Sequence, residues 1–150
     1  MTEQTKRIVV PTDLSSCADL ALDEAVAEAK LTGGDVELLQ VEEPLPYVGV
    51  DGATVPYSAE YDERVDADLA ERARLVREAG VQCSVSRQRG IAWQVIVEHA
   101  ERVGARRIVM VTHGRTGIRH VLLGSVAERV IQHAHCPVLV IPSRDKPAAG

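Results

Sequence analysis

Two glycines and a serine in the second half of the chain have the types and spacing of a phosphate-binding loop. Gly114 and Gly124 are separated by nine residues, and Ser125 follows Gly124 directly. The pattern Ser125-Val-Ala-Glu128 predicts a capping box, so we expect a helix to begin at about Ser125. Its first turn would offer unpaired backbone N–H groups and the positive end of the helix dipole, and a glycine lets a bulky anion approach the backbone. These residues therefore predict a cradle for a phosphate group.

The glycine loop follows a short apolar run of β type, Ile108 to Val111. It should therefore leave the carboxyl end of a strand, which is where open α/β sheets bind ligands. Arg115, with Arg119 and His120, would add positive charge inside the loop. The alternatives are that the glycines only shape a surface loop and that the arginines are solvated.

Side chains suited to catalysis are sparse. His113 could donate a proton beside a phosphate, although a capping or structural role is the alternative. Asp13, after the first predicted strand, is the acid best placed to meet a Mg²⁺ ion. The turn after that strand lacks the glycine spacing of a P-loop or a dinucleotide-binding fingerprint. We therefore expect a binding protein rather than an enzyme, with any ATP hydrolysis weak and incidental.

Strand and helix patterns alternate along the chain, which predicts a parallel, doubly wound α/β sheet of five strands and four helices. The first helix should be capped by Ser15 or Ser16 and end before Gly33. In the third strand Val81, Cys83 and Val85 alternate with polar residues, as in an edge strand that is wet on one side. The expected strands cover 6–12, 36–41, 81–87, 107–111 and 138–141, and the later helices 59–79, 92–103 and from 125 onward.

Length and composition bound the class of protein. The chain has 150 residues, 45% hydrophobic and 26% charged, which fits a single globular domain over 1–150 with its core at about 6–142 and a short tail at 143–150. A net charge of -5 argues against non-specific nucleic-acid binding. Without a signal-type leader or a membrane-length apolar run, we expect a cytoplasmic protein with no membrane partner. The three cysteines have no metal-ligand spacing and should be reduced.

Two regions outside the glycine loop also carry expectations. The segment 42–57 is rich in proline and glycine, so we expect a long loop that is functional or mobile, and Tyr47 and Tyr57 in it could cover a planar ligand or pack locally. The last strand, Val138 to Ile141, is fully apolar although it should lie at a sheet edge. A second copy of the chain would cover it, so we expect a homodimer through this strand; the alternative is cover by a helix or the tail.

Five segments between Arg7 and Pro142 carry a resemblance to a known family: VPTDLS (10–15), LLQV (38–41), VMVTHG (109–114), LLGSVAERV (122–130) and HCPVLV (135–140). With them, the chain resembles the universal stress protein family over nearly its full length. The resemblance implies a Rossmann-like sheet of order 3-2-1-4-5, with a crevice between the first and fourth strands.

In ATP-binding members of that family, a loop of pattern Gly-x-x-Gly-x9-Gly-Ser/Thr holds the phosphates. Resemblance to it makes Gly114 the second glycine, Gly124 the third and Ser125 the hydroxyl position, while Val111 stands where the first glycine would be. Pro11, Thr12, Asp13 and Val41 match the adenosine side, and Met110 and Val126 flank the cradle. Together with Asp13 as the possible contact to Mg²⁺ bound with ATP, and Arg115 from the charge of the loop, the expected nucleotide-binding residues are Pro11, Thr12, Asp13, Val41, Met110, Val111, Gly114, Arg115, Gly124, Ser125 and Val126.

Val111 leaves two structural alternatives open. Its side chain either overpacks the nucleotide site or turns into the core and leaves the cradle usable. The corresponding functions are an adenine-nucleotide-binding regulatory homodimer of the stress response, or a dimeric interaction protein with a vestigial site. A third reading, from a different class, is a weak ATPase or phosphotransferase in which Ser125 is modified.

Overall fold

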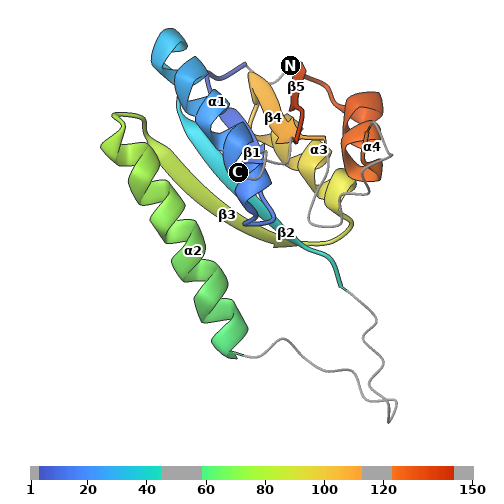
Figure 1. The fold of residues 1–150 in the computed structure, drawn as a ribbon. Coiled ribbons are helices and arrows are strands. Elements are labelled where there is room, and N and C mark those ends of the chain that lie inside the picture. Colours follow the sequence, from blue (N-terminus) through green and yellow to red (C-terminus); the bar gives the residue numbers. More distant parts are fainter. Residues whose placement is uncertain (1–3, 45–58, 113–122, 144–150) are drawn as a thin grey trace, which may run out of the picture.

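The computed structural model describes residues 4–44, 59–112 and 123–143. Within these ranges the chain forms one five-stranded parallel sheet of order β3-β2-β1-β4-β5, with four helices (Figure 1). The expected fold class and strand order are therefore confirmed. The strands are β1 (Ile8–Pro11), β2 (Val36–Glu42), β3 (Cys83–Arg89), β4 (Arg107–Val111) and β5 (Val138–Ile141), and the helices are α1 (Ser16–Thr32), α2 (Ala59–Glu78), α3 (Ala92–Arg102) and α4 (Ser125–His133).

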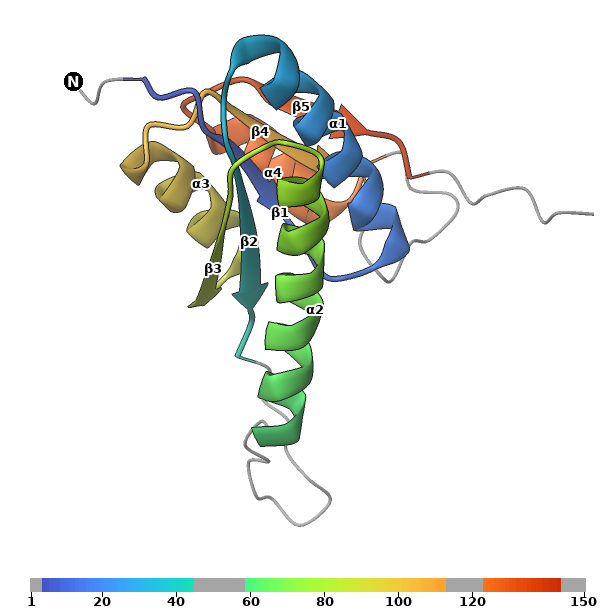
Figure 2. The same ribbon diagram turned by 90° about the vertical axis from the view of Figure 1, so that its left-hand side faces the viewer.

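The helices form two layers that cover opposite faces of the sheet. α1 and α2 lie on one face and α3 and α4 on the other (Figure 1). Figure 2 shows the sheet between α3 on one side and α1 on the other, with α2 running past the carboxyl ends of β2 and β3. This arrangement follows from right-handed crossovers between parallel strands.

Alternation along the strands divides the core into two hydrophobic clusters. In β1, Ile8 and Val10 belong to the cluster under α1, and Val9 belongs to the cluster under α3 and α4. In β2, Leu38 and Leu39 divide in the same way, and both side chains are fully buried. Strands buried on both faces read as continuous apolar runs, which is why these segments were recognisable in the sequence.

The ends of α1 follow the predicted signals. The Ser15 hydroxyl accepts a hydrogen bond from the Ala18 amide at 3.2 Å, so Ser15 is the N-cap. Gly33 closes the helix with φ 69°, a left-handed conformation that glycine adopts without a Cβ penalty.

The edge strand β3 differs from its prediction. It begins at Cys83 rather than Val81, and Val85 is 41% exposed although its alternation indicated a buried face. Beyond Cys83 that face of the sheet turns polar, because Arg87 occupies the space beneath α2 and hydrogen-bonds to Asp62 and Asp66. The apolar side of this strand is therefore limited to its first residue.

The segment expected as a loop from 42 to 57 starts later than predicted. Glu42 is the last residue of β2 and is buried, because the guanidinium groups of Arg87 and Arg89 hold its carboxylate. Glu43 accepts a hydrogen bond from the Ala92 amide at the start of α3. Residues 45–57 of the expected loop, with Tyr47 and Tyr57, lie outside the described residues.

Cys17, Cys83 and Cys136 are all free thiols. Burial raises the pKa of the Cys83 and Cys136 thiols, so both are poor nucleophiles at neutral pH. No helix in the described ranges is both long and apolar enough to span a bilayer.

Candidate functional site

The strand order places the predicted crevice at the carboxyl ends of β1 and β4, which are neighbours in the sheet. The two strands pair only at Ile8↔Arg107 and Val9↔Ile108, before their carboxyl ends. The chain leaves β1 toward α1 on one face of the sheet, and it enters α4 on the other face after β4. Divergent connections of this kind form the ligand-binding switch point of open α/β sheets.

On one side of this crevice lies the turn after β1, which is fixed by its own side chains. Thr12 is 8% exposed, and its hydroxyl accepts a hydrogen bond from the Leu14 amide at 3.0 Å. The Asp13 carboxylate accepts from the Ser15 amide at 3.0 Å, which makes an Asx turn. Leu14 has φ 65°, a conformation that is uncommon for a residue other than glycine. The turn therefore has one strained residue and a carboxylate of fixed orientation.

The other side is formed by the junction of β4 and α4. The Gly124 amide donates to the Thr112 carbonyl at 2.7 Å, so the start of α4 is fixed to the end of β4. Thr112 also bonds to Ser143 after β5 through its hydroxyl, at 3.1 Å. Thr112 was not among the predicted site residues, although it stands directly between the strand and the loop, a position that could have identified it.

The predicted helix start at Ser125 is correct, but the predicted capping box is wrong. Gly124 is the N-cap, without a side-chain cap bond, and its carbonyl accepts the first helical hydrogen bond from the Glu128 amide at 2.9 Å. Because the Glu128 amide is thereby engaged, the Ser125 hydroxyl does not cap it. The amides of Ser125, Val126 and Ala127 consequently have no acceptor within the helix, as expected of a first turn.

Three predicted site residues supply apolar groups on one face of the sheet. Val41 at the end of β2, Met110 in β4 and Val126 in α4 all belong to the cluster under α3 and α4. Val111 points to the opposite face and packs, partly buried, against the cluster under α1. Of the two alternatives for Val111, the structure therefore supports the one in which its side chain turns toward the core. Pro11, the last residue of β1, is half-buried beside the crevice.

Two predicted nucleotide-binding residues, Gly114 and Arg115, lie outside the described residues, as do His113, Arg119 and His120. Among the described residues no group of three or more His, Cys, Asp or Glu side chains could hold a metal ion. Asp13 by itself could contribute one ligand to an ion that arrives with phosphate oxygens.

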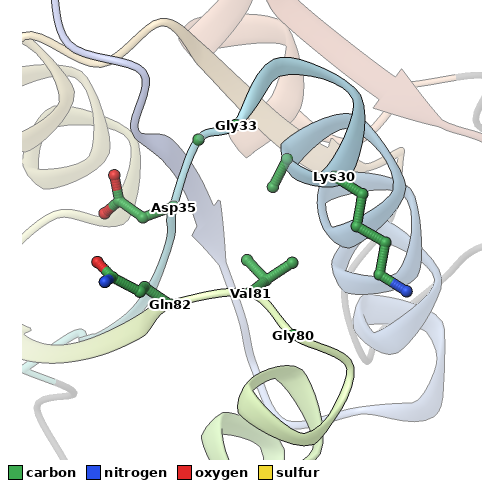
Figure 3. A pocket seen from close by; sticks show the side chains of 8 residues that line it. Lys30, Gly33, Asp35, Gly80, Val81 and Gln82 are labelled. Carbon is green, nitrogen blue, oxygen red and sulfur yellow. The ribbon is translucent and has the colours of Figure 1, made fainter.

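Two hollows open at the opposite, amino end of the sheet. The larger, of about 450 Å³, lies among the end of α1 and the starts of β2 and β3 (Figure 3). There Asp35 and Gln82 point away from Lys30, and Asp35 is bound by Arg7 at 2.7 Å. The smaller, of about 240 Å³, includes Cys136. Among the described residues that line the larger hollow, the polar side chains do not converge on one point. The carboxyl ends of β1 and β4 are therefore the better candidate for a ligand site.

The sequence profile of the Universal stress protein family matches residues 4–142. Universal stress protein MJ0531 of Methanocaldococcus jannaschii is 38% identical over 143 residues, which are 94% of this chain and 84% of that protein. The solved structure of MJ0577 from the same organism is similar with a TM-score of 0.74 at 29% identity, over 95% of this chain and 99% of that chain. A universal stress protein from Archaeoglobus fulgidus, solved in complex with dAMP, has a TM-score of 0.66 at 26% identity, over 93% of this chain and 99% of that chain.

Proposed function

This chain belongs to the universal stress protein family, and we propose that it is a regulatory module that binds an adenine nucleotide, ATP with Mg²⁺, in the crevice between β1 and β4. The observation that carries the proposal is that β1 and β4 are neighbours in the sheet, with the turn holding Asp13 after β1 and the amino end of α4 fixed to the residue that follows β4. The relative from Archaeoglobus fulgidus with bound dAMP supports the choice of an adenine nucleotide.

The phosphate groups would bind at the start of α4. The amides of Ser125, Val126 and Ala127 and the helix dipole favour an anion there, and Gly124 presents no Cβ to the approaching oxygen atoms. Gly124 has φ -68° and ψ 154°, which any residue can adopt. Gly124 would therefore matter because it leaves room for the phosphate, and not because its backbone conformation requires a glycine. We expect that a side chain at position 124 blocks the phosphate without straining the fold. We assign Gly114 and Arg115 to the same cradle.

The base and ribose would lie toward β1 and β2. Pro11 and Thr12 end the central strand, and Val41 at the end of β2 offers an apolar surface for the base. Met110 and Val126, which belong to the same cluster as Val41, would flank the phosphate cradle. Asp13 would meet the Mg²⁺ ion, because its carboxylate is the acidic group that the turn holds in place.

Chemistry at this site would be limited to slow, incidental hydrolysis. A carboxylate and a bound ion can orient phosphates, but the described residues provide no base positioned to activate water beside Asp13. We therefore propose a binding protein and not an enzyme. The cytoplasmic location expected from the sequence stays a prediction.

We also propose that the protein acts as a homodimer through β5. This strand lies at the sheet edge, pairs with β4 on one side, and its four apolar residues are all half-buried. An open apolar edge of this kind favours pairing with a second copy. The competing function, a dimer that binds no nucleotide, shares this interface.

Calorimetric titration with ATP and Mg²⁺ tests the nucleotide proposal. The parent protein, freed of co-purified nucleotide, should bind with a Kd in about the micromolar range, near -8 kcal/mol. Gly124→Val should abolish binding while its thermal unfolding stays close to that of the parent. Gln132→Val, exposed near the far end of the same helix, is the matched control and should bind normally. No binding by the parent would favour the dimer that acts without nucleotide.

A further inference from the structure

We propose that Arg72, in the middle of α2, is a positioning residue for the nucleotide site. It would hold the turn after β1 in the conformation that presents Asp13 to the Mg²⁺ and phosphate groups. This inference rests on the proposed nucleotide function and assigns a role to a residue that the sequence motifs leave out.

The Arg72 guanidinium joins α2 to both the turn and the first turn of α1. Its Nη2 donates to the Leu14 carbonyl at 2.9 Å, and its Nε donates to Asp19 Oδ1 at 2.7 Å. Further bonds reach Asp19 Oδ2 at 3.3 Å and the Asp68 carbonyl at 3.3 Å. The Arg72 side chain is 18% exposed, so water competes weakly for these contacts. A planar guanidinium with several fixed donors suits such a multiple contact, which an ammonium could not reproduce.

A single peptide unit connects Arg72 to Asp13. The carbonyl of Leu14 and the amide of Ser15 belong to the same rigid plane. Its carbonyl accepts the bond from Arg72, and its N–H donates to the Asp13 carboxylate. A rotation of this plane would break both bonds together, so the guanidinium fixes the orientation of the carboxylate without touching it.

The conformation held in this way is a strained one. Leu14 has φ 65°, and a left-handed conformation is unfavourable for a residue with a Cβ. The Thr12 hydroxyl supports it by accepting from the Leu14 amide at 3.0 Å. Without Arg72 the turn would lose one of the contacts that oppose relaxation, and Asp13 would sample other orientations.

Arg72 itself is not a phosphate ligand in this arrangement. Its charge is paired with Asp19, and its donors are directed at Asp19 and the Leu14 and Asp68 carbonyls. Arg74, two residues along, makes ion pairs with Glu71 and Glu78 on the exposed side of α2. Arg74 therefore provides a control with the same chemistry and no link to the turn.

A double-mutant cycle on nucleotide affinity tests the inference. By calorimetry with ATP and Mg²⁺, Arg72→Met should raise Kd about five- to tenfold, the lower part of the range usual for coupling between sites, whereas Arg74→Met should leave it within about twofold. Asp13→Ala should also weaken binding. Because Arg72 acts through Asp13, the variant carrying both changes should bind no more than about twofold worse than Asp13→Ala alone. Adding Leu14→Gly to Arg72→Met should recover part of the loss, since glycine adopts the left-handed conformation freely.

Circular dichroism should be used to check that each variant is folded. Arg72→Lys is a second variant that keeps the charge, and it should give an intermediate Kd. Unchanged affinity in Arg72→Met, no effect of Asp13→Ala, or losses that multiply in the double variant would each overturn this inference while the nucleotide proposal stands. Absence of any binding by the parent protein would overturn both.

Discussion

At Val111, the direction of the side chain determines whether a valine in place of the motif glycine blocks the nucleotide site. In the sequence it replaces a glycine of the phosphate loop, and there it could have closed the site. In the structure it packs against the cluster under α1, beside Leu139 and Ile141. Alternation along β4 sets this direction, because Met110 faces the opposite side of the sheet.

We therefore expect Val111→Gly to change stability and not affinity. Loss of a half-buried valine and a new glycine in a strand should cost about 1–3 kcal/mol in the free energy of unfolding, measured by urea titration. The Kd for ATP should stay within about twofold of the parent value. A large gain in affinity would instead show that the valine obstructs the nucleotide.

A buried polar network beside β2 was invisible in the sequence. His99 and Glu37 are 5% and 6% exposed, and their Nε2 and Oε1 atoms lie 2.8 Å apart. The His99 Nδ1 atom lies 2.7 Å from the Gln88 side-chain nitrogen and 2.9 Å from an Arg102 nitrogen, and Arg7 donates to the other Glu37 oxygen. With two donors at Nδ1, the imidazole must accept there and donate from Nε2 to Glu37.

Removing one member of this network should be costly. His99→Leu would leave the Glu37 carboxylate buried with Arg7 as its remaining partner, and we expect a loss of about 2–4 kcal/mol by urea unfolding. Adding Glu37→Leu should restore a large part of that loss, because both buried polar groups are then gone. Equal or greater destabilisation in the double variant would contradict this account. Such contacts join residues far apart in the sequence, and no local pattern announces them.

Among the elements, α2 is attached to the sheet by charge as well as by apolar packing. Val65, Leu69, Ala73 and Val76 form its buried stripe, at the spacing of an amphipathic helix. Toward its amino end, Arg87 of β3 bonds to Asp62 and Asp66 of α2 and to Gln40 and Glu42 of β2. The helix was predictable from its period, whereas this cross-link depends on the register between β2 and β3, which places Arg87 opposite Gln40.

Arg87→Met should therefore loosen the first half of α2. Glu42 would keep Arg89, whose side chain is 70% exposed, as its partner. We expect faster amide hydrogen exchange in α2 up to about Asp66, with a loss of about 1–3 kcal/mol in global stability. Arg74→Met on the exposed side of the same helix should leave stability close to that of the parent, because water screens its ion pairs. Similar exchange profiles in the two variants would mean that apolar packing alone holds the helix.

The start of α4 marks the limit of sequence motifs for helix ends. The Ser-x-x-Glu pattern identified where the helix begins but assigned the cap to the wrong residue. The hydrogen bond from the Gly124 amide to the Thr112 carbonyl fixes Gly124 at the cap position. A tertiary contact thus decided between two neighbouring residues that local propensity could not separate.

At the scale of the whole molecule, strand and helix periodicity alone indicated a parallel doubly wound sheet. The order of strands was not contained in that periodicity and came from the family resemblance, because many orders share the same alternation. Once the order is known, the candidate site follows from topology, because the adjacent parallel strands β1 and β4 place Asp13 and the start of α4 at the same end of the sheet. The exposure of Val85 in β3 could not be predicted from the sequence, because it depends on Arg87 occupying the space beneath α2.

The same topology leaves β5 as an apolar edge, and this exposes the dimer proposal to a direct test. A lysine in the middle of the strand should oppose pairing with a second copy, because two such charges would meet in an apolar interface. Val140→Lys should therefore sediment with the mass of one chain at concentrations where the parent sediments as two. Val85→Lys places the same charge on the opposite edge strand, at a side chain that is 41% exposed, and should remain dimeric.

Because Val140 also packs against the cluster under α4, circular dichroism must show that the Val140→Lys variant is folded. A parent protein that sediments as a single chain, or a folded Val140→Lys variant that still dimerises, would place the interface elsewhere or remove it. The strand would then be covered within one chain, as the alternative expects.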